Sequence, residues 1–263
     1  MVQKTYTKES LVNALLEIKN RGWIKSIRNV NNAGAIGNTL ENLLGIPENN
    51  LPIPNAAEWE LKTQRRNTSS LLTLFHLEPS PRALQIVNYL LINYGWPHQE
   101  AGKKYPITER SFRQTLSYQN PTSRGFFIDI DEERRKIIIQ FDPNCIKDEN
   151  LLWKNEIQKN GNLVYKNDYI PYWGFDDLFH KAGTKLGNCF FLIVDTKKEN
   201  SSYFYKYSDI MQLSNFSLDK LLYNIKEQNI LIDFDARTGH NHGTKFRIRP
   251  NAIPLLYSSV KKF

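Results

Sequence analysis

One short stretch of alternating charged and apolar side chains limits most strongly what this chain can fold into. Glu58, Trp59, Glu60, Leu61 and Lys62 follow one another. Successive side chains of a β-strand point to opposite faces, so this order predicts a strand with Glu58, Glu60 and Lys62 on one face. Trp59 and Leu61 then face the other way, into a core. We expect an amphipathic strand with one charged face.

A glutamate and a lysine two residues apart on one strand face suit the hydrolysis of phosphodiesters. The carboxylate can hold a divalent metal through oxygen, and the lysine can orient or deprotonate a water or contact a phosphate oxygen. A second carboxylate just upstream would complete the site, but Asn55 stands there. Its neutral amide oxygen would bind a metal more weakly. An ordinary strand with a solvated charged face explains the same residues, so this motif does not decide the function alone.

Composition favours an anionic partner for this chain. The formal net charge is +8 and the pI about 9.3, which indicates nucleic acid first and a membrane surface second. Cys145 and Cys189 belong to no metal-ligand or disulfide pattern, which fits a reducing cytoplasm. The polar start of the chain and the lack of a long apolar run predict no signal peptide and no membrane span.

The pattern along the chain predicts an α/β protein, one compact body with two lobes. Helices are expected at 7–20, 38–44, 82–93, 173–186 and 218–228. Strands are expected at 58–63, 71–75, 126–131, 136–141, 189–194, 203–207, 230–235 and 245–249. In the 173–186 helix, Phe175, Leu178 and Phe179 are expected to face inward. Residues 94–124 are read as loop-like.

Basic side chains gather in a second informative segment, 237–249. They are Arg237, His240, His242, Lys245, Arg247 and Arg249. Arginine can bond guanine bidentately in the major groove, and histidine can add single base contacts. Two alternatives stay open. The two histidines could form a metal pair, although no carboxylate lies nearby in sequence, or the segment could be a solvated basic hairpin.

Several separated blocks then resemble, in the same order, the MvaI/BcnI family of type II restriction endonucleases, which is related to the strand-nicking endonuclease MutH. The blocks are GNTLENLL at 37–44, NLPIPN at 50–55, EWELKT at 58–63, SLLTLF at 70–75, YWGFDDL at 172–178, YKY at 205–207 and HNHGTKFRI at 240–248. Together they extend over most of the chain, which makes the resemblance far more specific than any single motif.

The resemblance implies a PD-(D/E)XK nuclease: a restriction-endonuclease-like mixed β-sheet flanked by helices, with two lobes around a DNA cleft. It implies a catalytic lobe at about 1–150 and a recognition lobe at about 151–263. It further implies a monomer that uses Mg²⁺ to cleave double-stranded DNA at short GC-rich sites of the CC-x-GG kind. In the cell, such an enzyme is paired with a cognate DNA methyltransferase.

Residue by residue, the resemblance makes Glu60 the metal-binding acid and Lys62 the catalytic lysine. Glu41, on the preceding helix, corresponds to a glutamate that supports the metal or the lysine. His240, His242 and Arg247 fall in the segment that reads bases. The full set of predicted DNA contacts is Arg65, Arg66, Arg237, His240, His242, Lys245, Arg247 and Arg249.

Asn55 departs from the family pattern, which has an aspartate metal ligand there. Either the chain carries an introduced aspartate-to-asparagine change, or it is a natural sequence with altered metal use. The first is favoured because the surrounding residues follow the family. In both cases we expect this chain to bind DNA better than it cuts it. A MutH-like strand nicker and a non-catalytic DNA-binding protein of the same fold are the alternatives.

Overall fold

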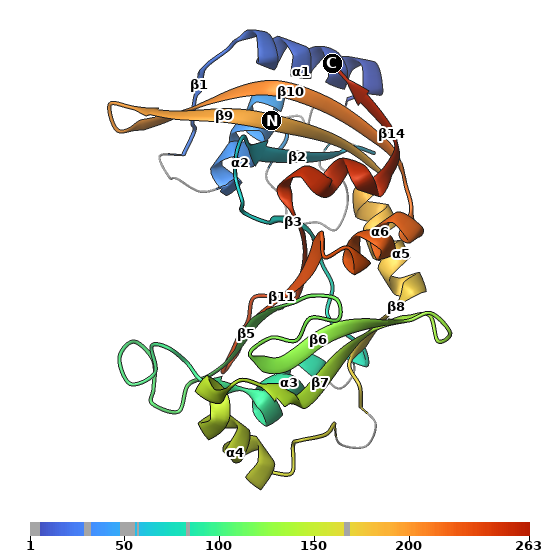
Figure 1. Ribbon diagram of the computed structural model, residues 1–263. Helices are drawn as coiled ribbons and strands as arrows, with labels where there is room; N and C mark the ends of the chain where they lie inside the picture. Colours follow the sequence, from blue (N-terminus) through green and yellow to red (C-terminus); the bar gives the residue numbers. More distant parts are fainter. Residues whose placement is uncertain (1–5, 29–32, 48–55, 57, 83–84, 166–168) are drawn as a thin grey trace. The chain divides into compact units, whose positions relative to one another are not determined.

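The computed structural model describes residues 6–28, 33–47, 56, 58–82, 85–165 and 169–263 (Figure 1). The chain divides into two compact units, and each is built from separate stretches of sequence. The first unit comprises Met1–Leu72, Ala182–Lys220 and Arg249–Phe263, and the second comprises Thr73–Lys181 and Leu221–Ile248. The lobe boundary expected near residue 150 therefore falls inside the second unit, because the chain leaves the first unit and later returns to it.

A five-stranded sheet forms the centre of the first unit. Its strands are β1 (Ile24–Lys25), β10 (Ser202–Phe216), β9 (Asn188–Glu199) and β2 (Glu60–Arg65) in that order, with β14 (Tyr257–Lys262) also paired to β10. β2 runs parallel to β9, whereas the other pairs are antiparallel. The sheet is therefore mixed, and β2 lies at one end of the strand order.

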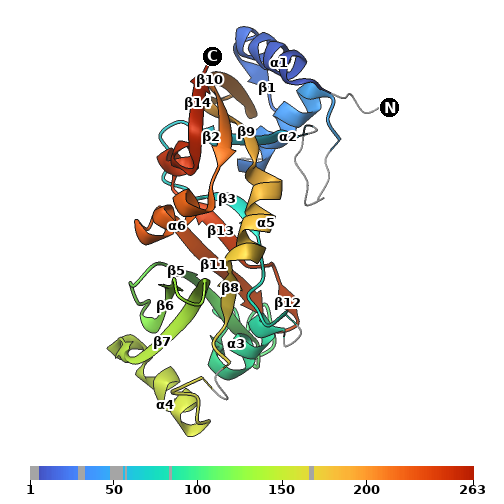
Figure 2. The same cartoon turned by 90° about the vertical axis from the view of Figure 1, so that its right-hand side faces the viewer.

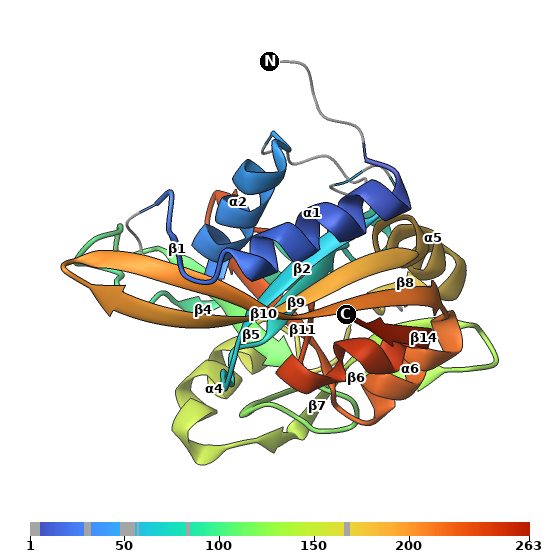
Figure 3. The ribbon, with the colours of Figure 1, turned by 90° about the horizontal axis from the view of Figure 1, so that it is seen from above.

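Two helices cover one face of this sheet. They are α1 (Lys8–Asn20) and α2 (Ala33–Leu44), and Figure 3 shows α1 lying across the strands. Thr7 caps α1 through a capping box with Ser10. Leu15 of α1 and Leu40 of α2 share one buried cluster with Leu61 of β2. The sheet face that carries Leu61 is thus the apolar one.

The second unit contains two sheets. A six-stranded sheet has the order β3 (Leu72–His76), β13 (Lys245–Ile248), β11 (Ile230–Arg237), β5 (Arg110–Leu116) and β4 (Trp96–Pro97), with β12 (His240–Asn241) paired to β11 (Figure 2). A three-stranded sheet has the order β6 (Arg124–Asp131), β7 (Lys136–Ile146) and β8 (Tyr172–Gly174). The helical segments are α3 (Ile86–Tyr94), η2 (Asp148–Asn150) and α4 (Leu151–Lys159). Three further helical segments lie where the chain passes between the units or returns to the first: α5 (Phe175–Leu186), α6 (Leu218–Lys226) and η4 (Pro250–Leu256).

Aromatic side chains hold the core of the second unit together. Phe112 of β5 meets Phe126 and Phe234 edge-on, with ring centroids 5.4 and 5.5 Å apart. Trp173 meets Phe246 edge-on at 5.3 Å, and its indole N–H donates to the Leu77 carbonyl at 3.0 Å. Such ring pairs add to the hydrophobic gain from burial. They connect strands that are far apart in the sequence.

The elements with strong periodicity were predicted correctly. The first helix and the strands β6, β11 and β13 lie where the pattern placed them, within a few residues, and β7 and β9 begin where expected but continue to Ile146 and Glu199. Other elements extend further than expected: β10 continues to Phe216, and α2 begins at Ala33 rather than at residue 38. The mixed α/β class is confirmed.

Four local predictions were wrong. Residues 94–124 are not loop-like, because they contain β4, β5 and the first residue of β6. In β5 the polar residues Arg113, Gln114 and Thr115, between buried Phe112 and Leu116, hid the strand pattern. Trp173 lies in β8 and not in the helix that follows, and Phe179 is 47% exposed and does not face inward. Glu58 lies in a turn before β2.

Leu40→Ala should destabilise the protein by about 2–5 kcal/mol, because the leucine is fully buried against the sheet and alanine leaves a cavity. Asn42→Ala on the exposed side of the same helix is the matched control and should stay within about 0.5 kcal/mol. Urea denaturation measures both. Equal effects of the two substitutions would contradict the packing of α2 on β2.

Candidate functional site

The candidate site is built around Glu60, the first residue of β2. Glu60 is only 2% exposed. Its Oε1 lies 2.8 Å from Nζ of Lys62, and its Oε2 lies 2.9 Å from Nζ of Lys185 on α5. The two lysine side chains are themselves only 15% and 19% exposed. One buried carboxylate is thus held between two ammonium groups, all within the first unit.

The alternation along β2 places these groups on one face. Leu61 belongs to the apolar cluster beneath α1 and α2, so Glu60 and Lys62 must face the other way. Their 2.8 Å contact fits that geometry. Just before the strand, the Trp59 ring packs against Phe190 of β9 at 4.8 Å between centroids. The hydrophobic contacts on one face therefore fix where the charged pair on the other face lies.

The parallel pairing of β2 with β9 brings Cys189 next to Glu60. Burial, helped by the charge of Glu60, raises the pKa of the Cys189 thiol to about 12. A thiol with this pKa stays protonated at neutral pH. Cys189 is therefore a buried, packed neighbour of the site.

Glu60 has the chemistry of a ligand for a hard divalent cation. Its Oε2 accepts no hydrogen bond from any described residue, although Lys185 lies close to it. Such an oxygen suits Mg²⁺, which binds through carboxylates and keeps several waters. Among the described residues no three His, Cys, Asp or Glu side chains form a complete metal-binding group. Asn55, the expected second ligand, lies outside the described residues.

The remaining predicted catalytic residue, Glu41, lies half-buried on α2. α2 packs against β2. Lys185 was missed by the sequence reasoning. It follows Lys62 by more than a hundred positions, and no spacing rule connects the two. The structure thus brings Glu60, Lys62 and Lys185 together and adds one cation to the expected set.

The basic residues of the second unit lie on a charged face of the six-stranded sheet. Arg247 donates to Asp233 at 3.0 Å, and Lys245 donates to Asp235 at 3.2 Å. Arg113 of β5 lies 2.8 Å from Asp235. Burial acts to raise the pKa of Asp235, but the Lys245 hydrogen bond and the nearby cations outweigh it, so the pKa lies below its ordinary value. Cations and carboxylates alternate on this face.

The hairpin tip beyond this face carries the two exposed histidines. The rings of His240 and His242 meet edge-on at 4.2 Å. Gly243 has a φ of +83°, which favours glycine. Glu78, just after β3, accepts hydrogen bonds from the backbone N–H and the hydroxyl of Thr244, both at 2.9 Å. The sequence reasoning also missed Glu78, which anchors the turn that presents the histidines.

The other predicted DNA-contact residues are spread over several elements. Arg237 is paired with Glu109 at 2.9 Å and lies over the Tyr105 ring. Arg66 donates to Asp195 at 2.6 Å and to Asp209 at 2.8 Å. These two hydrogen bonds raise the pKa of Arg66. Arg65 is half-buried on β2, and Arg249 is exposed at the start of η4.

Comparison with solved structures defines the class of this fold as that of a restriction endonuclease. The chain is similar to the "Restriction endonuclease MvaI-cognate DNA substrate complex", with a TM-score of 0.75, 26% identity, and coverage of 98% of this chain and 99% of that chain. It is also similar to "Restriction endonuclease MvaI in the absence of DNA", with a TM-score of 0.55, 25% identity and the same coverage. A comparison with curated proteins gives no significant match.

The family follows from the sequence match. The model of the MvaI/BcnI restriction endonuclease family matches residues 12–257, which is nearly the whole chain. The chain belongs to that family, and the resemblance noted from its sequence blocks is confirmed. No helix in the described part of the chain is long and apolar enough to cross a membrane.

Glu60→Gln should destabilise the metal-free protein by about 3–5 kcal/mol, because it leaves two largely buried ammonium groups without their counter-charge. Lys62→Met should cost less, since Lys185 still neutralises Glu60. Urea denaturation in the presence of a chelator measures both. A loss below about 1 kcal/mol for Glu60→Gln, the range of exposed ion pairs, would contradict the buried charge cluster.

Proposed function

We propose that this chain is a sequence-specific endonuclease that hydrolyses phosphodiester bonds of double-stranded DNA with Mg²⁺. The observation that carries this proposal is the buried Glu60 between Lys62 and Lys185, in a chain of the MvaI/BcnI restriction endonuclease family. The solved relative bound to its cognate DNA supports DNA as the substrate. The basic net charge fits the same partner.

Each residue of the first-unit site has a distinct role in this proposal. Glu60 holds the metal, with position 55 as the second ligand when it is aspartate. Bound there, Mg²⁺ would neutralise charge on the phosphate and lower the pKa of a bound water. Lys62, whose ammonium is paired with Glu60, orients the attacking water. Lys185 balances the negative charge of Glu60 and adds positive charge beside the phosphate, and Glu41 supports this arrangement from α2.

Base recognition is assigned to the charged face and the hairpin tip of the second unit. Arg247 suits bidentate bonds to guanine, and the exposed His240 and His242 suit single contacts to base edges. Asp233 and Asp235 on the same face can accept from the amino group of cytosine. The resemblance to the family implies a GC-rich site of the CC-x-GG kind, and this mixture of donors and acceptors is compatible with one. Lys245 and Arg237 border this face, and Arg65, Arg66 and Arg249 are proposed backbone contacts.

The cellular setting follows from this proposal. A sequence-specific nuclease in the cytoplasm requires protection of the host DNA, so a cognate methyltransferase is the expected partner. We propose that the enzyme acts as a monomer. A single active site then breaks a duplex by two successive nicks. Asn55 weakens metal binding, so this chain binds DNA better than it cuts it.

Asn55→Asp should raise cleavage of plasmid DNA strongly in the presence of Mg²⁺, because it supplies the missing anionic ligand. Gel electrophoresis followed by sequencing of the fragment ends measures the activity and gives the site. Lys62→Met added to this form is the control and should abolish cutting while binding persists. If the Asn55→Asp form cuts no DNA but binds it tightly, the non-catalytic DNA-binding alternative replaces the enzyme. Nicks without double-strand breaks would favour the MutH-like alternative.

Arg247→Ala should weaken binding to the cognate duplex by about 1–3 kcal/mol if its contact with guanine is bidentate. Fluorescence anisotropy with the cognate duplex and with an unrelated duplex measures the effect. Binding to the unrelated duplex should weaken much less. An equal loss on both duplexes would mark Arg247 as a phosphate contact.

A further inference from the structure

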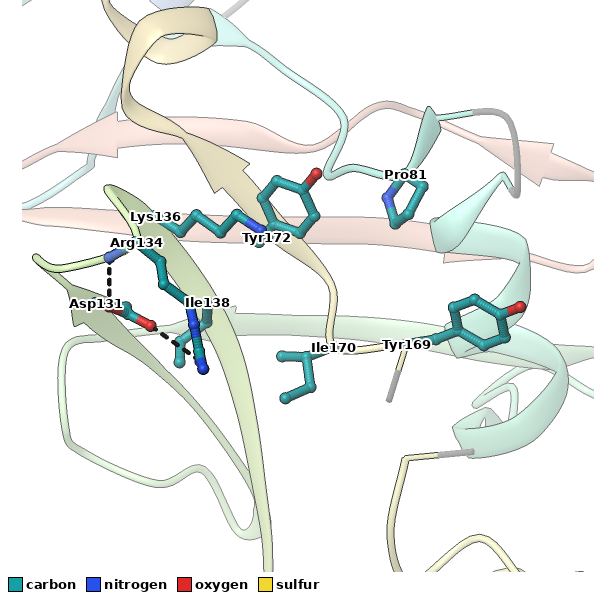
Figure 4. Close-up of a pocket in the computed structure, with 8 residues that line it drawn as sticks. All are labelled: Pro81, Asp131, Arg134, Lys136, Ile138, Tyr169, Ile170 and Tyr172. Carbon is teal, nitrogen blue, oxygen red and sulfur yellow. Dashed lines mark hydrogen bonds and ion pairs between the residues drawn. The ribbon is translucent and has the colours of Figure 1, made fainter. Parts of the chain in front are cut away.

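A hollow in the second unit shares no residue with the two groups described above. Its volume is about 490 Å³, within the range of small-molecule sites. It is lined by Pro81, Asp131, Arg134, Lys136, Ile138, Tyr169, Ile170 and Tyr172. Figure 4 shows these side chains, with Arg134 and Lys136 on one side of the view, Tyr169 on the other, and Ile138 and Ile170 between them.

Backbone pairing fixes the walls of this hollow. Asp131 pairs with Lys136 across the β6–β7 hairpin, and Ile138 pairs with Tyr172 between β7 and β8. The backbone groups of Tyr172 and Ser80 exchange two hydrogen bonds, of 2.7 and 3.1 Å, which bring Pro81 to the rim. Three segments far apart in sequence therefore form a defined site.

The hollow has one cationic end and one apolar, aromatic part. The Lys136 ammonium lies 3.8 Å from the centroid of the Tyr172 ring. The Arg134 side chain is 78% exposed and reaches Asp131 only at 3.5 Å, so solvent and ligands can approach it. With one aspartate against two cations, the lining has a net positive charge.

The apolar part is open to a ligand. Tyr169 is 41% exposed and Ile170 is 38% exposed. Large apolar side chains that line a concave site beside cations are a frequent signature of ligand binding. Proteins also hold single nucleotides by stacking the base on an aromatic ring and pairing the phosphate with a nearby cation.

We propose that this hollow binds a nucleoside monophosphate unit, with its base against Tyr169 and Ile170 and its phosphate at Arg134 and Lys136. The ligand can be a free nucleotide or one unpaired nucleotide of a DNA strand, since both offer the same chemistry. The inference deepens the proposed function, because it takes DNA as the natural source of that unit. It requires neither cleavage nor recognition of a duplex.

Isothermal titration calorimetry of the full chain with deoxyadenosine monophosphate tests this proposal. We expect saturable binding that is about tenfold tighter than that of inorganic phosphate, because stacking of one base contributes to affinity. Tyr169→Ala should remove most of that advantage. Arg134→Ala should weaken binding of the nucleotide and of phosphate alike. Tyr223→Ala, at an exposed tyrosine of α6 in the same unit, is the matched control and should change neither.

The outcomes separate this inference from the proposed function. The nucleotide site is overturned if the nucleotide gives no heat of binding, or if phosphate and nucleotide bind with equal affinity. Equal effects of Tyr169→Ala and Tyr223→Ala would also overturn it. If the Asn55→Asp form still cuts DNA in that case, the proposed endonuclease function holds and only the nucleotide site is rejected. A single-stranded oligodeoxythymidine that binds more tightly than the free nucleotide would identify an unpaired strand as the source. Circular dichroism melting shows whether each variant remains folded.

Discussion

The ion pairs of Glu60 with Lys62 and Lys185 are the interaction on which the candidate active site depends. A carboxylate that is 2% exposed would be strongly unfavourable without compensation, and two ammonium groups within 3 Å supply it. The same arrangement prepares the carboxylate for a cation. In the proposed function, Glu60 would hold a divalent metal, with Lys62 and Lys185 beside it.

This charge cluster is positioned by apolar contacts on the opposite face of the sheet. Leu61 and the helices α1 and α2 determine which side of β2 faces the core. Parallel pairing with β9 then fixes the height of Glu60 within the sheet. A shift of one residue in this register would bury Lys62 and expose Leu61. The precision of the site is therefore a consequence of hydrophobic packing several ångströms away.

The sequence predicted the local pattern better than the long-range contacts. Alternation at residues 59–62 identified the strand and the shared face of Glu60 and Lys62, because side-chain direction in a strand follows from local geometry. Lys185 and Glu78 could not be found in this way, since their roles arise from pairings between distant segments. In β5, Arg113 faces the charged side of the sheet, and the segment that contains it was mistaken for a loop. The hollow beside Tyr169 depends on three separate segments and leaves no signal in any one of them.

The central claim is that Glu60 carries the metal of a hydrolytic site. Binding of Mn²⁺, a spectroscopic substitute for Mg²⁺, can be followed by electron paramagnetic resonance in the Asn55→Asp form and in the same form with Glu60→Gln added. The account predicts saturable binding in the first protein and its loss in the second. Equal Mn²⁺ binding by both folded proteins would place the metal elsewhere and contradict the account.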